Sequence, residues 1–158
     1  MTAPRTADGR QVCHLAALAA FGLYAGAWIR LAARHGGPRP EGARPQDVLL
    51  TGVATFRLSR LIGKAKITRP LREPFTRVEG AGAPAELNES PKPAHGFLGA
   101  LLSCPFCLDV WVAATLTGAR QLWPRATPAI EHALAAVAAA DAAHLLYARL
   151  VRAAEDEG

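Results

Sequence analysis

The sequence contains few aromatic residues and few cysteines. Phe, Trp and Tyr make up 6% of the 158 residues, and there are three Cys. So few cysteines exclude a small scaffold held together by several disulfides. Alanine occurs 34 times, and hydrophobic residues reach 51% of the chain. That content excludes a chain disordered throughout, because such chains contain few apolar residues. The length predicts about one domain.

Most of the apolar residues fall into four blocks along the chain. Their bounds are Val12–Ile29, Val48–Gly63, Gly96–Ala119 and Ala129–Val151. A helix needs about 20 mainly apolar residues to cross a bilayer. The first and third blocks reach that length and lack the polar face of a helix in a soluble bundle. We therefore predict an all-α, small polytopic integral membrane protein with three to four transmembrane or membrane-embedded helices, rather than a soluble alanine-rich bundle.

The first block has an alternative interpretation as a cleaved signal peptide. Ala25-Gly26-Ala27 fits the small-residue cleavage site of such peptides. The apolar run continues through Trp28 and Ile29, which favours a membrane span. For domain organisation we predict an N-terminal helix and basic connector over 1–47, a membrane domain over 48–151 and an acidic tail over 152–158.

The second block determines how many spans are expected. It contains Arg57 and Arg60, each costing about 2.5–3.5 kcal/mol near the centre of a span. With four spans, ten Lys and Arg lie on the inner side and six on the outer; with three spans, the counts are 14 and 4. Because basic loops stay in the cytoplasm, the three-span count is the clearer one, although Arg–Asp pairing would reverse that preference. Both arrangements place the loop 64–95 and the C-terminus on the cytoplasmic side of the cell membrane.

Ionisable residues inside the apolar blocks form a second group of candidates. We predict an intramembrane charge network of Arg57, Arg60, Asp109 and Asp141, because an unpaired charge in a membrane is expensive. Lipid phosphates are an alternative partner for the arginines, which could also extend to the interface as anchors. In the fourth block, Asp141 with His144, and Glu131 with His132, permit a proton relay; we favour neutralisation of an arginine by Asp141, with Glu131 and His132 at the interface.

The stretch 64–95 is rich in proline, glycine and charge. We predict an ordered or semi-ordered loop that prolines hold extended. Basic residues beside a membrane contribute about 1 kcal/mol each towards anionic lipid. A positive-inside signal alone is the alternative interpretation, and nucleic acid is not predicted because no recognised module accompanies the charge. The candidate lipid-binding residues are Lys64, Lys66, Arg69, Arg72 and Arg77.

The sequence Cys104-Pro105-Phe106-Cys107 has the C-x-x-C spacing of thiol–disulfide motifs and of half a zinc site. Pro105 suits the first turn of a helix, which we predict over Pro105–Trp123. The helix dipole would then favour a reactive thiolate at Cys104. A structural zinc site needs four ligands, and only Cys13, His14 and His95 are available as others. Redox chemistry, metal binding and simple packing therefore stay open.

The sequence lacks a P-loop, a G-x-G-x-x-G after a strand, a G-x-S-x-G and an H-E-x-x-H. An enzymatic function would therefore rest on the cysteine pair alone, and no cofactor is predicted other than zinc as an alternative. We predict a non-enzymatic membrane component that acts by helix association and through its basic loop on anionic lipid headgroups. A homo-oligomer or a membrane partner protein is compatible with this prediction. The alternative is a thiol-redox or metal-binding membrane protein.

Three runs of sequence, in this order, resemble an uncharacterised bacterial membrane family, domain of unknown function 1360. They are T-x-R-L-S-R-L at 55–61, I-T-R-P-L-R-E-P-F-T-R-V-E-G at 67–80 and L-S-C-P-F-C-L-D-V-W at 102–111. The resemblance covers roughly 48–151 and implies a membrane location without an established activity. Ala65 and Asp109 depart from the pattern, which has an acidic and a small residue there. The matching positions are Arg57, Arg60, Pro70, Arg72, Pro74, Phe75, Cys104, Pro105, Cys107, Trp111 and Asp141.

Overall fold

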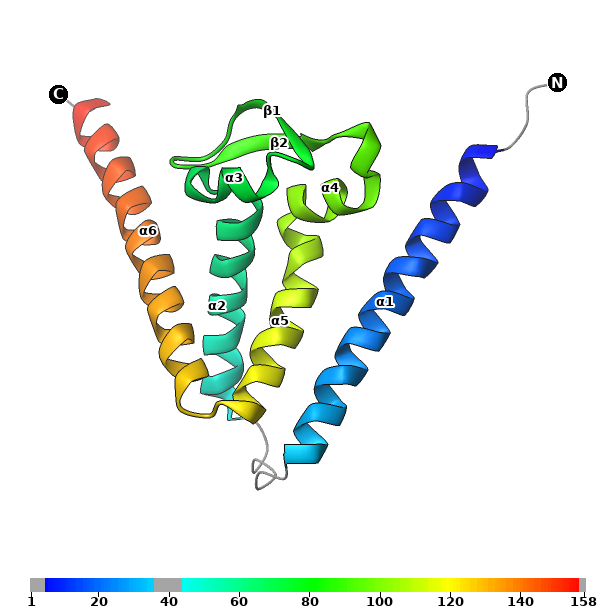
Figure 1. Ribbon diagram of the computed structural model, residues 1–158. Helices are drawn as coiled ribbons and strands as arrows, with labels where there is room; N and C mark the ends of the chain where they lie inside the picture. Colours follow the sequence, from blue (N-terminus) through cyan, green and yellow to red (C-terminus); the bar gives the residue numbers. More distant parts are fainter. Residues whose placement is uncertain (1–4, 36–43, 157–158) are drawn as a thin grey trace.

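Four long helices dominate the computed structural model, which describes residues 5–35 and 44–156, with side chains described for 15–35, 44–94 and 97–156. These helices are α1 (Arg5–His35), α2 (Pro45–Gly63), α5 (Pro105–Leu122) and α6 (Ala126–Asp156). Their directions alternate, so the start of α1, the end of α2, the start of α5 and the end of α6 lie at one end of the molecule (Figure 1). A β-hairpin covers α2 there, and we call this end the hairpin end.

Helix α2 is central, because it packs against both α5 and α6. The small core contains Ala54, Val112 and Leu116, with Leu58 and Leu134 packed around them. Most large apolar side chains on the outer faces of the helices stay exposed, among them Leu18, Leu23, Ile29, Leu49, Val110, Ile130, Leu145 and Leu146. A soluble protein rarely exposes so much contiguous apolar surface, whereas helices in a bilayer do so by necessity.

Helix α1 leans on α5 through aromatic side chains. Phe21 meets Trp111 edge to face, with ring centroids 5.4 Å apart. The Tyr24 hydroxyl lies 2.7 Å from the Thr115 hydroxyl. Trp28 lies so close to Gly118 that a Cβ there would come within 2.4 Å of its ring. A small residue at this position therefore lets the two helices approach each other.

The stretch 64–95 is folded, and the purely α-helical prediction was incomplete. It contains the short helices η1 (Lys66–Thr68), α3 (Arg69–Arg72) and η2 (Pro93–His95), and the antiparallel strands β1 (Thr76–Ala81) and β2 (Leu87–Pro91). Thr76 faces Pro91 in the register, which is irregular between Val78 and Gly80. Pro70 does not prevent helix formation, because it occupies the first turn of α3, where its missing N–H is not needed.

The third apolar block is two helices rather than one. Helix α4 (Gly96–Ser103) meets α5 at an angle of 86°, and Cys104 forms the break. Helix α5 begins at Pro105, as predicted, and ends at Leu122, one residue before the predicted end. At Gly99 a Cβ would lie 2.7 Å from the carbonyl oxygen of Phe75, so glycine lets α4 pack directly on the hairpin.

By length and composition, α1 (over Leu15–His35) and α6 could each cross a membrane, and the bent pair α4–α5 could form a third span. Helix α2 carries more charged residues than these candidate spans, because Asp47, Arg57 and Arg60 lie within it. The mostly helical fold with membrane-like helices agrees with the predicted class. Because α2 packs between two candidate spans, the number of spans depends on whether α2 also crosses the membrane.

Candidate functional site

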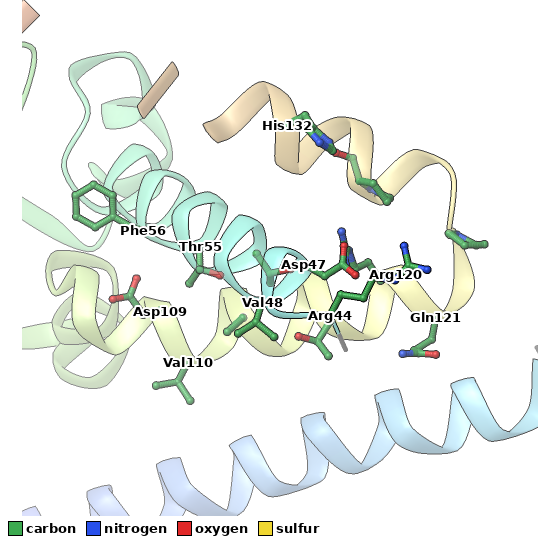
Figure 2. A pocket seen from close by; sticks show the side chains of 16 residues that line it. Arg44, Asp47, Val48, Thr55, Phe56, Asp109, Val110, Arg120, Gln121 and His132 are labelled. Atoms are coloured by element: carbon green, nitrogen blue, oxygen red, sulfur yellow. The ribbon is translucent and has the colours of Figure 1, made fainter. Parts of the chain in front are cut away.

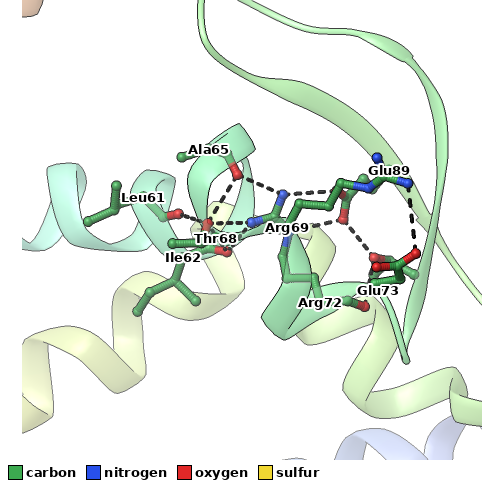
Figure 3. A network of polar contacts seen from close by, with 9 residues as sticks. Leu61, Ile62, Ala65, Thr68, Arg69, Arg72, Glu73 and Glu89 are labelled. Atoms are coloured by element: carbon green, nitrogen blue, oxygen red, sulfur yellow. Dashed lines mark hydrogen bonds and ion pairs between the residues drawn. The ribbon is translucent and has the colours of Figure 1, made fainter.

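A buried ion pair stabilises the hairpin end. The side chains of Arg72 and Glu89 are each 1% exposed. Arg72 donates from Nε to Glu89 Oε2 and from Nη2 to Oε1, both at 2.9 Å (Figure 3). Thr76 donates its hydroxyl hydrogen to the same carboxylate at 2.6 Å. This two-point geometry is among the strongest that an arginine and a carboxylate form.

The same arginine also caps α2. Arg72 Nη1 donates to the carbonyl of Ile62 at 2.7 Å, and Nη2 donates to the carbonyl of Ala65 at 3.1 Å. The Thr68 hydroxyl adds bonds to the carbonyls of Leu61 and Ala65. The last carbonyls of a helix lack partners within the helix, so these donors satisfy them. Arg72 thus connects α2, α3 and β2 in one contact set, which we call the Arg72 clamp.

The environment of Glu89 keeps it ionised. Burial alone would raise the pKa of this carboxyl. The hydrogen bonds from Arg72 and Thr76, together with the charge of Arg72, outweigh burial and lower the pKa below its ordinary value. The clamp is therefore a true ion pair at neutral pH.

A second ion pair attaches the hairpin turn to α2. Arg60 donates to both carboxylate oxygens of Glu86, at 2.9 and 2.6 Å. Two backbone bonds accompany this pair, from Lys66 N to the Ala85 carbonyl and from Leu87 N to the Lys64 carbonyl. The hairpin is consequently fixed to the end of α2 by side chains and backbone together.

The predicted network of four charges is divided between different partners. Arg57 pairs with Asp141 at 2.8 Å and so connects α2 to α6. Arg60 pairs with Glu86 in the hairpin, outside the predicted set. Asp109 accepts a hydrogen bond from Ser59 and has no cationic partner among the described side chains. Residues three apart on a helix differ in direction by a fraction of a turn, so Arg57 and Arg60 reach different neighbours.

Sequence reasoning missed a polar cluster at the opposite end of the bundle. Arg120 contacts Glu131 at 2.8 Å and Asp47 at 3.2 Å. Thr51 donates to Glu131 at 2.9 Å, and Glu131 is fully buried. The short turn between α5 and α6 folds Glu131, which was predicted at the membrane interface, back onto Arg120. Arg120 and Glu131 lie close together in the sequence on either side of that turn, and this proximity could have indicated their ion pair.

The other residues of the fourth block are more exposed. His132 lies on the outside, with Nδ1 2.6 Å from the carbonyl oxygen of Pro128, and His144 is also exposed. Asp141 is occupied by Arg57. The arrangement of the described side chains therefore provides no chain of ionisable groups through α6 for a proton relay.

The basic residues of the loop differ in accessibility. Lys66 and Arg69 are exposed, and Lys64 is half-buried. Arg77 is exposed and pairs with Glu79 at 2.9 Å. Arg72 was predicted to face lipid, but it is buried in the clamp and cannot do so.

Large apolar side chains lie between the accessible cations. Ile67 is 81% exposed and Leu71 is 72% exposed. We call the segment 66–71, with its two exposed cations and these two apolar side chains, the ledge. The clamp holds Arg72 inward at the end of this segment, and the ledge faces outward.

The cysteine motif begins α5. Cys104 accepts a hydrogen bond through Sγ from the backbone N–H of Cys107, and the two sulfurs lie 2.7 Å apart. Cys107 is exposed, and Cys104 is half-buried. Among the described side chains, no three His, Cys, Asp or Glu converge to hold a metal ion. The side chains of Cys13, His14 and His95 lie outside the described part.

Comparison with known proteins gives a family but no activity. No curated protein and no solved structure matches the chain. The family model of a protein of unknown function, DUF1360, matches residues 50–147. This range contains the Arg72 clamp, the ledge, the cysteine pair and the Arg57–Asp141 pair. Because the match covers more than half of the sequence, the chain belongs to the DUF1360 family, as its motifs indicated.

Proposed function

We propose that the protein is a non-enzymatic component of the cell membrane with four spans, and that its hairpin end is cytoplasmic. The position of α2 carries the proposal. Helix α2 runs beside α5 and packs between α5 and α6 (Figure 1). If α5 and α6 cross the bilayer, α2 must share their depth. The Arg57–Asp141 pair reduces the cost of the charge that α2 brings into the membrane.

The distribution of cations supports this orientation. The hairpin end carries ten Lys and Arg, against five among the described residues of the other end. Cytoplasmic loops carry the excess of basic residues in membrane proteins. The three-span alternative has a clearer charge count, but it would require α2 to lie outside the membrane while α5 crosses it. The packing of these two helices favours four spans.

The hairpin end would act on the anionic surface of the cytoplasmic leaflet through the ledge. Lys66 and Arg69 contribute charge, and Ile67 and Leu71 contribute apolar surface that inserts at the level of the headgroups. The clamp keeps this surface rigid. Helix association is the other part of the proposal, because exposed alanines on α6 let a second helix approach closely. Cross-linking through Ala140→Cys tests that part.

Insertion of the ledge is tested in nanodiscs. With an environment-sensitive fluorophore on Ile67→Cys, we expect quenching by lipids spin-labelled near the headgroup. Quenching should be stronger with phosphatidylglycerol than with phosphatidylcholine and should weaken in high salt. Lys66→Ala with Arg69→Ala should reduce it, whereas Arg77→Ala, which removes an exposed cation outside the ledge, should have a smaller effect. Quenching that is unaffected by salt, by lipid charge and by the double variant would count against the proposal.

The thiol-redox alternative is kept because the two sulfurs of the cysteine motif are adjacent. A pair in this position could cycle between dithiol and disulfide. If it does, the purified protein should gain two mass units on reduction before alkylation, and Cys104→Ser should abolish the change. A pair that stays reduced under mild oxidants, and that serine replaces without loss of growth or stability, eliminates this function.

A further inference from the structure

A groove lies along α2 and α5 and reaches the start of α6. Its volume is about 1110 Å³, and its apolar lining includes Val48 and Val110 (Figure 2), together with Gly52 and Ala113. A Cβ added at Gly52 would meet nothing within 4 Å, so the space is open there. Pockets for small molecules are typically about 300–1,000 Å³, mostly apolar, with a few placed polar groups. The groove is slightly larger than this range, and about half of the residues that line it are apolar.

One end of the groove carries a hydroxyl without a hydrogen-bond partner and a carboxylate without a cationic partner among the described side chains. Thr55 is 7% exposed, and its hydroxyl has no hydrogen-bond partner among the described residues. Figure 2 shows Thr55, Phe56 and Asp109 together at this end. Ser59 is fully buried and donates to Asp109, which fixes one carboxylate oxygen. Buried hydroxyls in proteins are nearly always hydrogen-bonded. The Thr55 hydroxyl oxygen is itself buried, so the carboxylate of Asp109 is the group at this end that a ligand in the groove could reach.

The charges along the groove define the kind of ligand. Asp109 has no cationic partner among the described side chains, whereas Asp47 and Asp141 each pair with an arginine. Arg120, at the other end, is shared between Asp47 and Glu131. Arg44 also lies at that end (Figure 2) and would repel a cation there. A positive group in the groove would therefore settle at Asp109.

We propose that this groove binds an amphipathic organic ammonium. Its charge would lie against Asp109, while its apolar part would cover Phe56, Val110 and Val48. A carboxylate inside a membrane domain is usually paired or marks a path for substrate or ions, which agrees with this assignment. The site is independent of the lipid-binding ledge, which lies on η1 and α3.

The test uses the full-length protein in detergent, with 1-naphthylmethylammonium as the probe and neutral 1-naphthylmethanol as its isostere. Calorimetry should show saturable binding of the ammonium and at least about tenfold weaker binding of the alcohol, since one charge-assisted hydrogen bond is worth that much. Asp109→Asn should weaken ammonium binding by about the same factor, and Asp109→Glu should retain most of it. Ser59 can still donate to the amide of Asp109→Asn, and thermal unfolding checks that this variant folds.

Two further variants test the Thr55 hydroxyl and the open space at Gly52 independently of each other. Thr55→Val should leave the affinities of the primary ammonium and of its trimethylammonium analogue unchanged, because the Thr55 hydroxyl is buried out of reach of the groove. Gly52→Leu should weaken both cations by filling the groove. Glu79→Gln, an exposed change in the hairpin, is the matched control and should have no effect. Any of three results would overturn the assignment: a lack of saturable binding, equal affinity for the neutral alcohol, or full affinity in Asp109→Asn.

Discussion

Replacing Arg72 with alanine is expected to lower the free energy of unfolding by about 3–5 kcal/mol, the cost of leaving a buried partner charge uncompensated. The substitution would remove both bonds to Glu89 and the caps on the carbonyls of Ile62 and Ala65. The hairpin would then separate from α2, since the clamp joins them. Chemical or thermal unfolding of the purified protein in detergent measures the loss.

Arg77→Ala is the matched control for Arg72→Ala. It removes an arginine of the same hairpin region whose ion pair is exposed, so the expected loss is about 0–1 kcal/mol. Arg72→Lys should recover only part of the stability, because an ammonium cannot reproduce the two-point contact with Glu89. Equal stability of Arg72→Ala and Arg77→Ala would show that the clamp does not stabilise the fold.

The clamp also predicts how stability depends on pH. The pKa of Glu89 is lower in the folded protein than its ordinary value of 4.5. Its contribution is therefore present above about pH 4.5 and is lost as the pH falls through the lower folded pKa. Glu89→Gln should be less stable than the wild type at neutral pH, and the difference should shrink in acid. A difference that is constant from neutral to acid pH would contradict the assignment of an ion pair.

Replacing Arg120 is the second change with a large expected effect. Arg120→Ala leaves Glu131 fully buried, with Thr51 as its one remaining donor among the described side chains, and it releases Asp47. We expect a loss of about 3–5 kcal/mol, measured by unfolding in detergent. The contacts between the starts of α2 and α6 and the end of α5 should loosen together, because Arg120 reaches both neighbouring helices.

A double variant distinguishes the lost pair from a simple loss of side-chain volume. Arg120→Met with Glu131→Gln removes both charges and should be more stable than Arg120→Ala. Arg125→Ala, in the exposed turn after α5, is the control and should cost less than about 0.5 kcal/mol. If the double variant is as unstable as Arg120→Ala, the buried charge is not the cause.

The sequence predicted the long helices well because apolar blocks of sufficient length have few alternatives. It also located the start of α5, since Pro105 occupies a position that proline favours. It did not reveal the hairpin, whose two strands are mostly exposed and carry only a weak alternation. The contacts that hold β1 and β2 come from Arg60 and Arg72, which lie earlier in the chain, so local pattern could not identify them.

The chemistry of the candidate sites was less predictable than the helices. Five cations in one loop look alike in sequence, yet Arg72 is buried, Lys64 is half-buried and the other three are exposed. Which cation is buried depends on where α3 meets the end of α2, a tertiary contact. The pairing of Arg57 with Asp141 required only one helix–helix contact, and it was among the pairs that charge neutralisation indicated.

Cysteine accessibility shows whether α2 crosses the membrane, because it reports on which side each end of the helix lies. In a protein whose native cysteines are replaced by serine, single cysteines at Gln46, Arg125 and Glu79 report on the two ends of the bundle. With a membrane-impermeant maleimide on intact cells, four spans with a cytoplasmic hairpin end predict labelling at Gln46 and Arg125 and protection at Glu79 until the cells are permeabilised. Protection at Gln46 together with labelling at Arg125 would place α2 outside the bilayer and contradict the account.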